Sequence, residues 1–162
     1  MRSLQKAVAL IEAWPPARDK ERREIAALFH EMIRGCEEAV RVWEEYLKAP
    51  GPPGDRWSIV SWIGPERAKR LYEINLRLKE PMRRICAAAD EKLGRLVHYE
   101  DSLIEMAYRQ LQPGETGPDA ARKAVQRMEA RIGTLRDLAR RIEAEKAPLA
   151  HGAPGHREQP LS

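Results

Sequence analysis

Apolar residues recur at alternating steps of three and four between Pro65 and Val97, which is the spacing of one face of an α-helix. This spacing predicts one long helix over residues 65–97, with its apolar face in the middle of the core. Pro81 lies inside the segment and cannot donate a backbone hydrogen bond, so it is expected to kink or divide the helix. The predicted stripe comprises Ala68, Leu71, Asn75, Leu78, Met82, Ile85, Ala89 and Leu96.

Two further segments carry the same pattern, residues 19–48 and residues 118–146. Asp19 is placed to cap the first of them. In the second, apolar residues keep a heptad spacing from Ala121 to Ile142, which is typical of antiparallel packing between helices. The sequence therefore predicts an all-α bundle of four to five helices, three of them long.

Shorter amphipathic segments are expected to pack against the three long helices. Residues 3–14 form the first, with Ser3 placed as its cap. Residues 102–111 form the second, and Ser102 with Glu105 three residues later matches a capping box. Both segments are predicted to be short helices of the same bundle.

Proline and glycine separate the helical segments at residues 50–54 and 113–117, which are expected to be loops. Residues 55–63 are rich in aromatic and β-branched side chains, and we interpret them as helical turns because a lone strand has no partner elsewhere in the chain. The bundle is predicted to form a single domain over residues 1–147. Residues 148–162 hold little apolar material and are predicted to be a flexible, disordered C-terminal tail.

Charge is distributed along the helices rather than gathered in one block. The chain has 33% charged residues and a net charge of +4. Three glutamates of the central segment each precede an arginine by four residues, which favours ion pairs within that helix. The three predicted pairs are Glu66 with Arg70, Glu73 with Arg77, and Glu80 with Arg84.

Candidate chemistry is sparse. None of the four histidines follows a glutamate by three residues, as the ligands of a di-iron bundle would, so we expect no metal and no cofactor. Cys36 and Cys86 lie at or near apolar stripes without a histidine at short helical spacing. Asn75 is interpreted as a polar residue that sets the register of the core. The sequence therefore favours a protein that is not an enzyme.

The N-terminal apolar run is too short for export or for a membrane. Residues 7–11 are apolar, but Glu12 interrupts them and Trp14 with two prolines follows in place of a cleavage site. No run approaches the roughly 18 apolar residues of a membrane-spanning helix. Together with the two isolated cysteines, these features predict a cytoplasmic protein without a membrane partner.

The segment from Ser58 to Leu71 resembles the helix-hairpin-helix DNA-binding motif. The resemblance implies that hairpin amides and the N-terminus of the second helix hold a DNA phosphate. Trp62 stands where the family has its first hairpin glycine. The matching residues are Ile63, Gly64, Pro65, Ala68 and Leu71.

Two functions follow from these patterns. The leading hypothesis is an interaction subunit, adaptor or regulator that contacts another protein or a multi-subunit complex, with Trp57 and Trp62 as anchors near the proline-rich loop. Self-association is left open. The alternative is a nucleic-acid-binding accessory protein that uses the basic central and C-terminal helices. Its candidate residues are Gly64, Arg67, Lys69, Lys79 and Arg83.

Overall fold

The described chain is helical throughout its regular parts and contains no strand. The computed structural model describes residues 1–51, 58–100, 102–104 and 111–144. Within them the all-α prediction is confirmed. The elements are α1 (Arg2–Glu12), the 3-10 helix η1 (Pro16–Arg18), α2 (Asp19–Lys48), α3 (Ile59–Ile63), α4 (Pro65–Ala89), α5 (Glu91–Glu100) and α6 (Gly117–Glu143).

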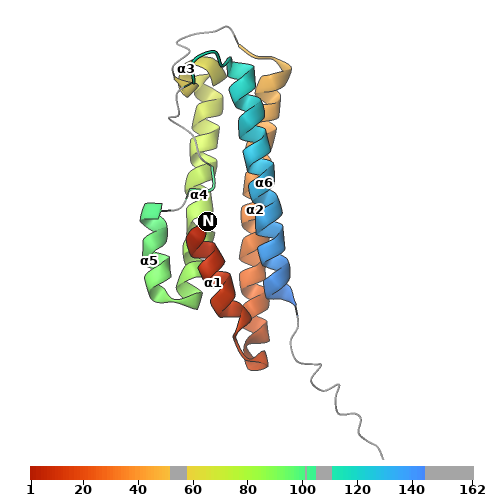
Figure 1. Ribbon diagram of the computed structural model, residues 1–162, viewed down its shortest axis with the longest axis vertical. Helices are drawn as coiled ribbons and strands as arrows, with labels where there is room; N and C mark the ends of the chain where they lie inside the picture. The colour runs from red at the N-terminus through yellow and green to blue at the C-terminus, as the bar shows by residue number, and fades with distance from the viewer. Residues whose placement is uncertain (52–57, 101, 105–110, 145–162) are drawn as a thin grey trace, which may run out of the picture.

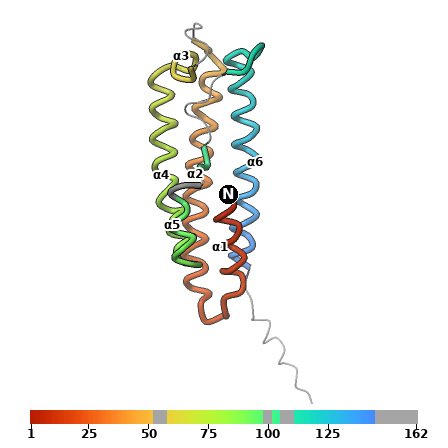
Figure 2. The backbone as a smooth tube through the Cα atoms, turned by 60° about the vertical axis from the view of Figure 1, so that its left-hand side comes forward, coloured from red at the N-terminus to blue at the C-terminus, as the bar shows by residue number. Residues whose placement is uncertain are grey.

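Three long helices run side by side, with α2 between α4 and α6 (Figures 1 and 2). The short helix α1 contacts both α4 and α6, and thereby closes one half of the bundle as a fourth helix. In the other half, the described residues Leu103, Ile104 and Leu111 are buried and complete the core. The heptad seam of α6 faces inward as predicted, because Met128, Leu135 and other members of it are buried.

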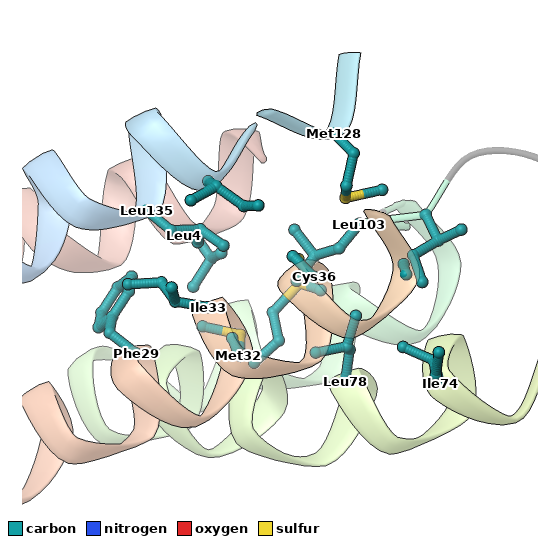
Figure 3. Close-up of a cluster of buried hydrophobic side chains, with 14 of the residues drawn as sticks. Leu4, Phe29, Met32, Ile33, Cys36, Ile74, Leu78, Leu103, Met128 and Leu135 are labelled. Carbon is teal, nitrogen blue, oxygen red and sulfur yellow. The ribbon is translucent and has the colours of Figure 1, made fainter. Parts of the chain in front are cut away.

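The core is formed by side chains from every α-helix of the bundle. Figure 3 shows Leu4 of α1, Phe29 and Met32 of α2, Ile74 and Leu78 of α4, and Leu135 of α6 converging in one cluster. Leu78 is 3% exposed and Leu135 is fully buried, as the two apolar stripes require. These contacts hold α4 and α6 against opposite sides of α2.

The single helix predicted over residues 65–97 is in fact two helices, α4 and α5. The break between them lies at Asp90 and not at Pro81. Helix α4 continues through the buried Pro81 to Ala89, and Asp90 then adopts an extended conformation. The Asp90 carboxylate accepts a hydrogen bond from the Lys92 amide at 2.8 Å, which caps α5. Because α5 turns back along α4, Leu96 leaves the predicted stripe and is 44% exposed.

Two of the three α4 arginines predicted to pair within their own helix, Arg70 and Arg77, pair with the neighbouring helix instead. Arg70 contacts Glu45 at 3.2 Å, and Arg77 contacts Glu38 at 3.0 Å. Both partners belong to α2. The second pair lies seven residues, or about two turns, from the first on each helix, and the residue numbers run in opposite directions because α2 and α4 are antiparallel. The predicted partners Glu66 and Glu73 are left exposed at the surface of α4. The partners of Arg70 and Arg77 come from α2, and the spacing of residues along α4 alone could not predict them.

The predicted serine caps are wrong where the structure describes them. Ser3 lies buried inside α1, which begins at Arg2. Ser102 precedes no described helix, because residues 102–104 are irregular. Its hydroxyl donates instead to the Ile104 carbonyl at 2.7 Å and lies 3.2 Å from the Asn75 side-chain oxygen. Asn75 therefore ties α4 to the segment that follows α5.

Several predictions fall on residues outside the described ranges. They include the loop beyond Gly51, most of the predicted helix over residues 102–111, and the tail over residues 148–162. The division between a domain at 1–147 and this tail stays a prediction. Among the described helices, none is long and apolar enough to cross a membrane.

Candidate interaction surface on α4

Trp62 lies in the core at one end of the bundle. Its side chain is 6% exposed, and its ring centroid lies 5.8 Å from that of Trp43 and 5.8 Å from that of Tyr46. Gly117 of α6 packs against Tyr46 and Trp62 so closely that a Cβ there would lie 3.1 Å from Trp62 Cε3. In this arrangement Trp62 joins α3 to α2 and α6. The other predicted anchor, Trp57, lies outside the described residues.

Gly64 makes the turn between α3 and α4. Its φ of 98° is a backbone conformation that residues with a Cβ rarely adopt. Its amide donates to the Val60 carbonyl at 3.0 Å and closes α3. The hairpin glycine of the resembled motif is therefore present with suitable backbone geometry, although α3 has only five residues.

Arg67 is committed to contacts inside the bundle. Its Nη1 donates to the Ile63 carbonyl at 3.2 Å, and its Nε lies 3.3 Å from the Glu45 carboxylate. Its guanidinium also lies 5.9 Å from the centre of the Tyr46 ring, and burial raises the pKa of Tyr46 although this charge opposes the shift. Arg67 thus links three helices, and it shares the Glu45 carboxylate with Arg70.

The remaining predicted cations share one face of α4 with two exposed apolar side chains. Positions 69, 76 and 83 are seven apart, as are 72 and 79, so these residues form one stripe along the helix. Tyr72 is 44% exposed and Leu76 is 50% exposed. We call this set the outer stripe of α4; it consists of Lys69, Tyr72, Leu76, Lys79 and Arg83.

The cations of the outer stripe are not equivalent. Arg83 is held by Glu80 at 2.7 Å, and the hydrogen bond from Arg83 lowers the pKa of Glu80. Lys69 and Lys79 form no ion pair within the described part of the chain. The stripe therefore presents an apolar pair between two lysines whose charges have no partner there.

Sequence reasoning placed the lysines but missed Tyr72 and Leu76. Both lie outside the buried stripe that the periodicity predicts, so the periodicity gave neither of them a role. The sequence nevertheless contained the pattern, because Tyr72 stands seven residues before Lys79, and Leu76 stands seven residues after Lys69 and seven before Arg83. A second apolar spacing on the solvent face of a helix is the pattern that identifies such a pair.

Two hollows lie along the seam between α2 and α6, with volumes of about 450 and 480 Å³. Glu37 and Arg136 line both, and their ion pair of 2.8 Å spans the seam. His30 and Glu143 form a second bridge at 3.0 Å. The Glu37–Arg136 pair thus lies between the two hollows, and the His30–Glu143 contact lines the second of them.

No cluster of three or more potential metal ligands occurs among the described residues. Cys36 is buried beneath the α2–α6 contact, and burial raises the pKa of its thiol to about 12. A thiol in that environment is a packing residue rather than a nucleophile. Comparison of the chain with protein families, with curated proteins and with solved structures finds no match.

Proposed function

We propose that this protein is a non-enzymatic, cytosolic interaction subunit or adaptor that contacts another protein through the outer stripe of α4. The observation that carries the proposal is the pair Tyr72 and Leu76, two large apolar side chains about half exposed and one turn apart. Aromatic and aliphatic side chains at the centre of a polar surface are typical anchors of protein interfaces. The bundle behind them provides a rigid support, because Leu71, Ile74 and Leu78 of the same helix are buried.

Co-purification with matched variants tests this proposal. The wild-type chain, Leu76→Ser and Leu96→Ser are expressed in native cells and purified after nuclease treatment, and bound proteins are quantified by mass spectrometry. Leu96 is the control because it is also an exposed leucine, at 44%, but lies on α5. We expect a stoichiometric protein partner that is lost with Leu76→Ser and kept with Leu96→Ser. Equal recovery with both variants would contradict the role of the stripe.

Nucleic-acid binding is the second candidate, favoured by the exposed Lys69 beside the aromatic Tyr72. Against it, Arg67 and Arg83 are engaged by Glu45 and Glu80. Affinity for nucleic acid falls steeply with salt as phosphate contacts release counterions. We therefore expect weak binding of a labelled duplex or single strand at low salt, with no binding near physiological salt, when measured by fluorescence anisotropy.

A further inference from the structure

The charges around the outer stripe of α4 select among the partners that it could take. Lys69 and Lys79 lie ten residues apart, which is about 15 Å along a helix. Tyr72 and Leu76 lie between them. The stripe is thus apolar at its centre and basic toward both ends.

The two lysines differ from Arg70 and Arg77 of the same helix, which are paired, and Lys69 is exposed whereas Lys79 is half-buried. Arg70 and Arg77 point toward α2 and are paired there with Glu45 and Glu38. Lys69 and Lys79 have no such partner in the described part of the chain. A carboxylate that approached the stripe could therefore form an ion pair with either ammonium group without displacing one that already exists in the described part of the chain.

A row of acids along one edge of the stripe disfavours a polyphosphate. Glu66, Glu73 and Glu80 are exposed and seven residues apart, so they follow the stripe along its whole length. A nucleic-acid backbone laid along α4 would meet these carboxylates as well as the lysines. A peptide helix can instead place single acidic residues against the lysines. Its edge that faces the row of glutamates can carry no acidic residue.

We infer that the segment which docks on the outer stripe is an acidic amphipathic helix of a partner protein, with two apolar residues three or four apart and a carboxylate about one turn beyond each. Its apolar pair packs on Tyr72 and Leu76, and its carboxylates reach Lys69 and Lys79. This inference rests on the proposed function, and it adds the chemistry of the partner.

A displayed library of helical peptides, randomised along one face and selected on the full-length chain, tests the inference. We expect the enriched peptides to carry the apolar pair with Asp or Glu on both sides. Their affinity should fall about tenfold or more for the double variant Lys69→Glu with Lys79→Glu, because two attractive charge pairs become repulsive. The control variant, Lys20→Glu with Lys48→Glu, has the same net charge but its changes are on α2. It should bind the peptides like the wild type.

The outcomes separate the inference from the function on which it rests. Enriched peptides that depend on Leu76 but carry no acidic residues would overturn the inference and leave the proposed function standing. Peptide binding that is indifferent to Leu76→Ser would overturn both. Duplex binding that persists at physiological salt and is lost in the Lys69 and Lys79 variant would assign the stripe to nucleic acid. Self-association in sedimentation, abolished by Leu76→Ser, would assign it to a second copy of the chain.

Discussion

Leu78 of α4 lies directly over Gly35 of α2, so that a Cβ on residue 35 would stand 2.6 Å from Leu78 Cδ2. The mid-helix glycine, which costs about 1 kcal/mol against alanine, is thereby explained by the close approach of another helix.

The contact predicts that Gly35→Ala destabilises the wild-type protein but stabilises a protein in which Leu78 has been truncated. Gly35→Ala should lower the free energy of unfolding, because the new methyl group overpacks the core by about 1–3 kcal/mol, more than the helix propensity returns. Leu78→Ala alone should cost about 2–5 kcal/mol. In that background Gly35→Ala should become stabilising, since the obstructing side chain is gone. Urea denaturation of the wild type, the two single variants and the double variant measures this double-mutant cycle. Additive changes in the free energy of unfolding would contradict the contact.

Two other glycines, Gly94 and Gly133, offer a test with an internal control. A Cβ on Gly94 would stand 2.9 Å from the Ala87 Cα, so Gly94→Ala should force α5 away from α4 and lower the melting temperature. Gly133 is exposed in the middle of α6, and nothing lies within 4 Å of its Cβ position. Gly133→Ala should therefore raise stability by up to about 1 kcal/mol. Thermal melting by circular dichroism compares the two, and equal effects would argue against the α4–α5 contact.

The buried guanidinium of Arg22 caps the end of α1. Arg22 is 2% exposed, and it donates to the Ile11 carbonyl at 2.8 Å and the Trp14 carbonyl at 3.0 Å. Arg22→Met should leave the Trp14 carbonyl without this donor, whereas the Ile11 carbonyl keeps the hydrogen bond from the Trp14 amide at 3.0 Å. The free energy of unfolding should fall by about 1–3 kcal/mol. The neighbouring Arg23 is exposed, so Arg23→Met should change it by less than about 0.5 kcal/mol. Similar losses for both variants in urea denaturation would show that the cap does not stabilise α1.

The thiols should be unreactive until the protein unfolds. Cys36 and Cys86 are both buried, so Ellman's reagent should label neither thiol in the native protein and both in denaturant. The pKa of Cys36 rises from 9.0 to about 12 on folding, so the unfolded chain loses this proton first as the pH increases. Stability should therefore be unaffected by this group below about pH 9 and fall between pH 9 and pH 12. Cys36→Ala should flatten that part of the stability profile, and an unchanged profile would exclude Cys36 as its cause.

Periodicity along the chain determined the helical class and the bounds of α2 and α6 to within a few residues. It also identified the buried stripes through Leu78 and Leu135, because the side-chain spacing of a helix is a local property that each segment carries in its own order of residues. The candidate lysines of the outer stripe could likewise be read from the sequence.

Only the tertiary structure decided the features that depend on a second element. The reversal of the chain at Asp90, the partners of Arg70 and Arg77, and the burial of Trp62 all arise from helices that meet across the bundle. The exposure of Tyr72 and Leu76 is of the same kind, since a side chain is exposed only where no other element covers it. Spacing within one helix reports which residues share a face, whereas packing decides which of those faces meets a neighbour and which meets solvent.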